Sequence, residues 1–273
     1  MEQSQDKNKL SIARLCKLHT KLKAEKQTWE NHWQEVADYF VPRKNDITTT
    51  RSPGQKNTWN LLDSTGVFSN ELLAGFLHGI LSNPDVPWFE LTTGDPKTDE
   101  QPLVRRWLQD TAKKVLSLIN SSNFQTEAHE MYIDLPSIGT SCMLVAPDNE
   151  RGVRFSTKFI TEFCIKENKF GIVDTLFREW KATAAELIEE FGEDNVPEAV
   201  RKCFADGKET KYVVVHAVYP RYMVDPTFSG QRKFLSCYYL PELKHELDSG
   251  EFRKFPYLVP RWSKGTNEYY GIS

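Results

Sequence analysis

The sequence lacks the features that mark several large classes of protein. Of its 273 residues only 14 are glycine and 14 are proline, which is too few for a collagen-like or low-complexity chain. The net charge is only −3, whereas a protein that coats DNA regardless of sequence is normally basic overall. The charge balance therefore argues against nucleic-acid binding over the whole surface and leaves room for a local basic patch.

The sequence also has no long apolar run and no cysteine pattern. Its most apolar window, residues 72–81, is far shorter than the roughly 20 residues that a membrane span needs, and His78 interrupts it. The five cysteines are scattered and form no C-x-x-C pair. We therefore expect no signal peptide, no membrane span and no membrane partner, and we expect reduced thiols rather than disulfides or a zinc site.

Most motifs of enzyme chemistry are missing. We find no P-loop, G-x-G-x-x-G turn, G-x-S-x-G elbow or H-E-x-x-H pair, and the six histidines are spread out. One short pattern remains: Pro147-Asp148 after one predicted strand and Glu167-Asn168-Lys169 after another. This is the P-D…E-x-K spacing of a Mg²⁺-dependent nuclease, in which Asp148 and Glu167 would hold the metal and Lys169 would polarise water. The same residues are ordinary in turns, so we keep the nuclease only as an alternative and predict no catalytic, cofactor or metal site.

The chain begins with helical periodicity and continues with extended segments. Apolar residues at three- and four-residue steps predict a helix that Pro42 ends, then helices over 68–80, 100–120 and 124–139. The helix over 68–80 is so apolar that we expect it to be buried, in this subunit or against a neighbour, and Gly75 and Gly79 would permit close packing there. Residues 88–91 are expected to form a short strand. Further strands are predicted over 141–146, 153–157, 161–166, 171–180, 212–219, 233–240 and 257–262.

These elements predict an α+β fold, with N-terminal helices followed by a mixed, largely antiparallel β region with one inserted helix. Thr183 and Glu186 have capping-box spacing at the start of that helix, which we place near 183–204. We divide the chain into an N-terminal helix and polar loop (1–56), a helical subdomain (57–139) and a β-rich subdomain (140–273). The loop, 43–58, contains Pro53-Gly54, and segment 1–56 has an excess of Lys and Arg that also permits a helical adaptor or DNA-binding module.

Four segments together resemble the portal, or head-to-tail connecting, protein family of short-tailed bacteriophages. They are 87–91 (PWFEL); 122–124 (SNF) with 127–132 (EAHEMY), 134–135 (DL) and 138–140 (IGT); 174–178 (DTLFR) with 183–187 (TAAEL) and 191–192 (FG); and 256–262 (PYLVPRW) with 270–271 (YG). Their order and approximate spacing also fit, and the resemblance covers most of the chain.

The resemblance implies a wing-like fold and a structural role without bond chemistry or cofactors. Members of this family form a ring, usually a dodecamer, at one capsid vertex, where terminase, capsid and tail or adaptor proteins are its partners. Double-stranded DNA passes through the channel without sequence-specific binding. The implied location is the virion, and the host cytoplasm during assembly. Family members are much longer, so the resemblance also implies that this chain is the N-terminal, wing part of a portal, truncated before the channel-lining helix.

Overall fold

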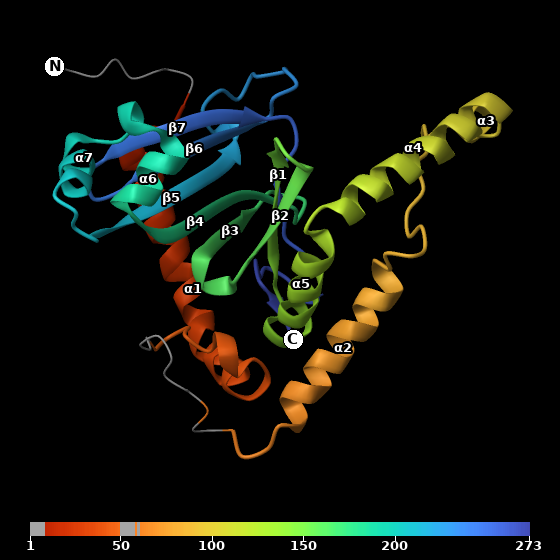
Figure 1. Ribbon diagram of the computed structural model, residues 1–273, viewed down its shortest axis with the longest axis horizontal. Coiled ribbons are helices and arrows are strands. Elements are labelled where there is room, and N and C mark those ends of the chain that lie inside the picture. The colour runs from red at the N-terminus through yellow and green to blue at the C-terminus, as the bar shows by residue number, and fades with distance from the viewer. Residues whose placement is uncertain (1–8, 50–57, 59–60) are drawn as a thin grey trace. The chain divides into compact units, whose positions relative to one another are not determined.

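The computed structural model describes residues 9–49, 58 and 61–273, and its helices and antiparallel sheets confirm the predicted α+β class (Figure 1). The chain divides into two units. One contains residues 1–31, 160–256 and 266–270, and the other contains 32–159, 257–265 and 271–273. The first helix, α1 (Ile12–Phe40), contributes to both and stops just before Pro42, as predicted. The predicted turn at Pro53-Gly54 lies outside the described residues.

The first unit is built on a five-stranded antiparallel sheet with the order β3-β4-β5-β6-β7. Side chains of one strand alternate between the two faces of a sheet, so each face has its own core. In β5, Val215 and Ala217 belong to the core beneath α1, whereas Val214 belongs to the core beneath α6 and α7. The bounds are β3 (Phe163–Glu167), β4 (Val173–Thr183), β5 (Lys211–Pro220), β6 (Phe234–Leu240), β7 (His245–Phe252), α6 (Ala184–Phe191) and α7 (Glu198–Ala205).

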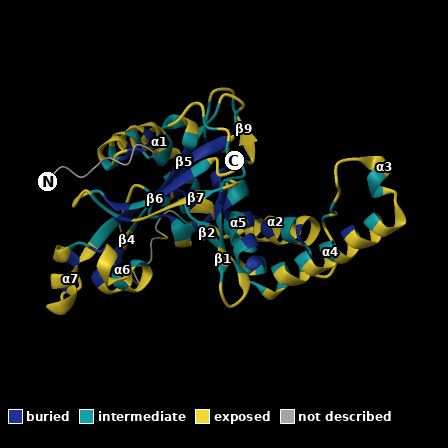
Figure 2. Cartoon of the chain, turned by 90° about the horizontal axis from the view of Figure 1, so that it is seen from above, coloured by how far each residue is buried: buried dark blue, intermediate teal, exposed yellow. Residues whose placement is uncertain are grey.

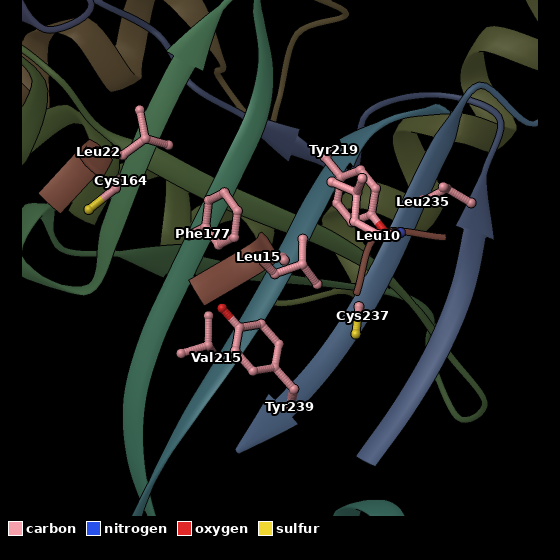
Figure 3. Close-up of a cluster of buried hydrophobic side chains, with 11 residues drawn as sticks. Leu10, Leu15, Leu22, Cys164, Phe177, Val215, Tyr219, Leu235, Cys237 and Tyr239 are labelled. Atoms are coloured by element: carbon pink, nitrogen blue, oxygen red, sulfur yellow. The ribbon is translucent and has the colours of Figure 1, made fainter. Parts of the chain in front are cut away.

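Figure 3 shows the core beneath α1, where aliphatic side chains of the helix meet aromatic and sulfur-containing side chains of the sheet. Leu15 and Leu22, seven residues apart on α1, lie on one face of the helix and are almost completely buried. Phe177 and Tyr239 from the sheet are equally buried. The apolar spacing that predicted α1 is therefore the pattern that fastens it to this sheet.

The second unit combines helices with a three-stranded antiparallel sheet of order β2-β1-β8. Helix α5 packs on α2 and on β2, and a small core including Ala74, Phe124, Tyr132 and Met143 joins them. The bounds are α2 (Thr65–Leu81), α3 (Pro96–Asp99), α4 (Pro102–Ser121), α5 (Phe124–Ile138), β1 (Cys142–Asp148), β2 (Gly152–Lys158), β8 (Tyr257–Leu258), β9 (Ser263–Lys264) and β10 (Gly271–Ile272).

Three of the predicted elements differ from the structure. The single helix near 183–204 is two helices, because Gly192 leaves helical geometry at φ +84° after α6 and α7 begins only after Pro197. Residues 88–91 form no strand: Trp88 stacks on Phe124 instead, with ring centroids 5.9 Å apart. The strand predicted over 257–262 shortens to β8, with an isolated bridge at Arg261.

Helix α2 has the predicted position but not the expected burial within the chain. Only Asn70 and Ala74 of this helix are buried. A Cβ atom built on Gly75 or Gly79 meets nothing within 4 Å, so these glycines make no close contact inside the chain. Figure 2 shows exposed residues along α2 and α4.

Candidate functional site

The strongest of the four sequence motifs fastens α5 to the edge strand β2. The Asn123 amide donates to the carbonyl oxygen of Phe155 at 2.7 Å, and its Oδ1 accepts from the Phe155 N–H at 2.9 Å. One turn later, Glu127 Oε2 accepts from the Thr157 N–H, and the Thr157 hydroxyl donates to the Glu127 carbonyl at 2.8 Å. These polar side chains therefore satisfy backbone groups that an edge strand leaves unpaired.

The first motif contributes two aromatic side chains to a cluster at the start of α5. Phe124, the first residue of α5, packs edge to face on Phe155 of β2 with ring centroids 5.0 Å apart. Trp88 of the first motif stacks on Phe124, and Phe89 lies edge-on to Trp88 at 4.9 Å. Residues 87–91 thus dock through side chains on the start of α5, which is a contact that strand propensity did not predict.

The second and fourth motifs meet at two glycines. Gly139 ends α5 in the left-handed conformation, φ +82°, and a Cβ atom there would lie against the backbone of Gly271. A Cβ atom on Gly271 would in turn lie against the Gly139 carbonyl oxygen. The Gly271 N–H donates to the Thr140 hydroxyl at 2.7 Å, and the Trp262 N–H donates to the Gly139 carbonyl at 2.8 Å. Both glycines are therefore required by a close backbone approach.

A buried ion pair joins α5 to the segment that follows α1. Asp134 of α5 is 1% exposed, and both of its carboxylate oxygens accept from Lys44 Nζ, at 2.8 and 2.9 Å. Lys44 also pairs with Glu130 at 2.8 Å. Burial raises the pKa of Asp134 to about 6, although the ammonium group of Lys44 acts in the opposite direction. Asp134 belongs to the second motif, but nothing in the motif indicates its partner 90 residues away.

The third motif lies on β4 in the first unit, and its polar residues make structural contacts. The carboxylate of Asp174 accepts from the Tyr222 hydroxyl at 2.9 Å. The Arg178 guanidinium pairs with Glu162 at 3.0 Å and lies over the Trp180 ring. The following Thr183 and Glu186 form the predicted capping box at the start of α6, which confirms that expectation.

Each residue of the nuclease alternative lies at the end of a strand or in the turn that follows it. Asp148, at the end of β1, accepts from the N–H groups of Glu150 and Arg151 at 2.8 and 2.9 Å, and so closes the turn to β2. Glu167 ends β3, which belongs to a different sheet from β1, and Lys169 lies over the Phe170 ring in the next turn. Across the described ranges, no cluster of three His, Cys, Asp or Glu residues is arranged to hold a metal. The arrangement gives the nuclease interpretation no support.

Part of the basic excess of segment 1–56 is used inside the first unit. Lys23 pairs with Glu179 of β4 at 2.9 Å, and Lys26, which is buried, donates to the Thr161 carbonyl at 3.0 Å. Burial lowers the pKa of Lys26. Lys9 pairs with Glu246 of β7 at 2.6 Å. These three lysines hold the N-terminal segment in the first unit, Lys23 and Lys9 on strands of the sheet and Lys26 on the turn before β3. None of the helices in the described part of the chain has the length and apolarity needed to cross a membrane.

Comparison with known proteins defines the class to which these motifs belong. The family model described as bacteriophage head to tail connecting protein matches residues 13–273, and the chain therefore belongs to this family. It is 33% identical over 276 residues to a probable portal protein of Bordetella phage BPP-1, covering 98% of this chain and 49% of the relative. It is 28% identical over 267 residues to the portal protein of Salmonella phage epsilon15, covering 95% of this chain and 48% of the relative. The chain thus spans about half the length of both relatives, and the resemblance seen in the four motifs is confirmed.

Proposed function

We propose that the chain acts as part of a structural portal subunit, which assembles into a ring at one vertex of a phage capsid. In this role it contributes to genome packaging, genome ejection and tail attachment. The observation that carries the proposal is the family match over residues 13–273, together with the two relatives named as portal proteins. A connector between head and tail must contact both, so capsid, tail or adaptor proteins and the packaging terminase are the proposed partners.

The proposal includes a dodecameric ring with double-stranded DNA passing through its channel without sequence-specific binding. DNA that slides should meet few fixed Lys or Arg contacts to phosphate, because each contact adds to salt-dependent binding. The net charge of −3 and the internal pairing of Lys9, Lys23 and Lys26 agree with this. The proposed location is the virion, and the host cytoplasm during assembly.

We propose further that this part of the subunit makes or breaks no covalent bonds. The motif side chains that would be candidates for chemistry are engaged in holding elements together: Asn123 and Glu127 on β2, Thr140 on Gly271, and Arg178 on Glu162. The division into residues 1–56, 57–139 and 140–273 and the assignment to the wing of a portal remain predictions.

Electron microscopy of the purified full-length protein tests the proposal directly. We expect ring-shaped particles with a central hole and a single stoichiometry. Only monomers, under conditions in which other portal proteins assemble, would contradict it. Incubation with DNA and Mg²⁺ tests the absence of chemistry, since cleavage that Asp148→Ala abolishes would restore the nuclease alternative.

A further inference from the structure

A chain of directed hydrogen bonds fixes the position of the proton on His78, near the end of α2. The carbonyl oxygen of Pro84 can only accept, and it accepts from Nδ2 of Asn120 at 2.9 Å. The Oδ1 atom of Asn120 then accepts from Nε2 of Gln125 at 3.0 Å. Gln125 therefore turns its Oε1 atom toward Nε2 of His78, 2.6 Å away. Because an amide oxygen only accepts, His78 carries its proton on Nε2.

This proton position leaves a lone pair on Nδ1 of His78. In a neutral imidazole one nitrogen donates and the other accepts. Among the described residues, Nδ1 of His78 has no hydrogen-bond partner, and neither have the two ring nitrogens of His129. Both side chains are half-buried, so solvent and small ions reach them. Neutral imidazole nitrogens are the commonest protein ligands of transition metals, so the pair has the chemistry of a metal site.

The rings of His78 and His129 lie at a distance that a shared metal ion permits. Their centroids are 5.7 Å apart and their planes are inclined at 38°. A zinc–nitrogen bond measures about 2.0–2.1 Å and the ring centre lies about 1.1 Å behind the nitrogen, so two imidazoles on one ion have centroids at most about 6.4 Å apart, and about 5.2 Å apart in tetrahedral geometry. The observed separation lies between these two values. His78 belongs to α2 and His129 to α5, so an ion held by both would join the two helices.

The hydrogen-bond chain also supplies the outer contacts that a metal-binding histidine normally has. Such a histidine donates its second N–H to an acceptor that the protein holds in place, and this contact orients the ring. In His78 the acceptor is Gln125, which is oriented in turn by Asn120 and Pro84. These residues lie on α4, on α5 and in the segment after α2, so the fold sets the direction of the ring before any ion binds.

The side chains around the pair favour a transition metal over Mg²⁺ or Ca²⁺. The carboxylates next to His129 are engaged elsewhere, because Glu127 accepts from the Thr157 N–H and Glu130 pairs with Lys44. Two nitrogen ligands, with water in the remaining positions, suit Zn²⁺, Ni²⁺ or Cu²⁺, whereas Mg²⁺ and Ca²⁺ require oxygen ligands from the protein. Closed structural zinc sites have four protein ligands, so the site expected here is an exchangeable one.

We propose that His78 and His129 bind one divalent transition-metal ion, represented by Zn²⁺, between α2 and α5. The two histidines are far apart in the sequence, so their spacing did not indicate a site. Only Asn70 and Ala74 of α2 are buried, and an ion that binds the folded chain would stabilise the attachment of this helix. The site is independent of the portal role.

Titration of the untagged full-length protein with Zn²⁺ tests the site, after a chelator has removed bound metal. By isothermal titration calorimetry, His78→Ala and His129→Ala should each lose one zinc equivalent that the wild type binds. The matched control is His32→Ala, which removes an exposed histidine of α1 and should retain that equivalent. Gln125→Leu keeps both ligands but removes the acceptor, so it should weaken this binding roughly 10-fold or more. Circular dichroism checks that each variant is folded, and Mg²⁺ should not compete.

Electron paramagnetic resonance with Cu²⁺ gives a second measurement that needs no change of the chain. The wild type should show a copper centre with two imidazole nitrogens, and His129→Ala should lose it. Zinc binding that both His78→Ala and His129→Ala retain, no zinc binding by the wild type, or an equal loss in His32→Ala would overturn the site. Binding that Gln125→Leu leaves unchanged would overturn the role of the hydrogen-bond chain.

Discussion

Lys44 and Asp134 offer a sharp test of how α5 is held in the second unit. In Lys44→Met the aliphatic part of the side chain remains, but the carboxylate of Asp134, 1% exposed, loses the ammonium group that both of its oxygens contact at 2.8 and 2.9 Å. Removing one partner of a buried ion pair leaves a desolvated charge, which costs about 3–5 kcal/mol of unfolding free energy. We expect Lys44→Met to lose that much near neutral pH, measured by urea denaturation.

The loss should depend on pH, with a sign that follows from Asp134. Burial raises its pKa from 3.8 to about 6, so between these values the folded chain binds the proton more tightly than the unfolded chain. Its contribution to stability is therefore present at low pH and is lost as pH rises through about 6. Without Lys44 the pKa of Asp134 rises further. Lys44→Met should thus approach wild-type stability as pH falls from about 8 to about 5.

A double variant separates the unpaired charge from other effects. In Lys44→Met with Asp134→Asn no buried charge remains, so we expect most of the loss caused by Lys44→Met alone to be recovered, because a neutral pair carries no desolvated ion. A Lys44→Met loss below about 1 kcal/mol, or one that is the same at both pH values, would refute the role assigned to this pair.

Three further predictions concern the motif residues and one buried histidine. Gly139→Ala should cost more than about 2 kcal/mol of stability, because of its positive φ and the adjacent Gly271 backbone, while Gly207→Ala, at φ +65° in open space, should cost about 1 kcal/mol; equal losses in thermal denaturation would argue against the close approach. Asn123→Ala should cost about 1–3 kcal/mol and speed hydrogen exchange at the Phe155 N–H, which loses its partner; unchanged exchange would contradict the pairing. Burial lowers the pKa of His216 to about 3, so its contribution to stability is present above about pH 6.5 and is lost as pH falls; a change in the NMR chemical shifts of its imidazole carbons between about pH 7.5 and 5 would contradict this.

The helices and most strands were predictable because their apolar residues recur at a fixed period. This holds for α1, where Leu15 and Leu22 enter the core of the first unit, and for β5, where alternate residues enter two different cores. Strand β7, with the sequence HELDSGEF, was missed because it lies at the edge of its sheet and is mostly polar. An edge strand carries little of the apolar alternation on which such predictions depend.

The wrong predictions have a common physical origin in contacts that are distant in sequence. Residues 88–91 have the composition of a strand, but a strand needs a neighbour for its hydrogen bonds, and Trp88 found an aromatic partner in Phe124 instead. Helix α2 is largely exposed within the chain, and its burial against a neighbour stays a prediction, because apolar composition indicates that a face will be covered without indicating by what.

The roles of the motif residues were less predictable than their positions. The four segments identified the family, yet nothing in their residues indicated that Asn123 pairs with the backbone of Phe155, 32 positions away. The approach of Gly139 to Gly271 joins two motifs that the sequence separates by more than a hundred residues. Such contacts depend on the whole fold, so periodicity cannot reveal them.

We propose that this chain is part of the connection between the head and the tail of a phage particle. Immunogold labelling of purified particles with antibodies against the chain, after mild opening of the capsid, tests it most directly. We expect gold at a single vertex, where the tail joins the head. Label spread over the whole capsid, or absent from particles that are otherwise complete, would contradict it.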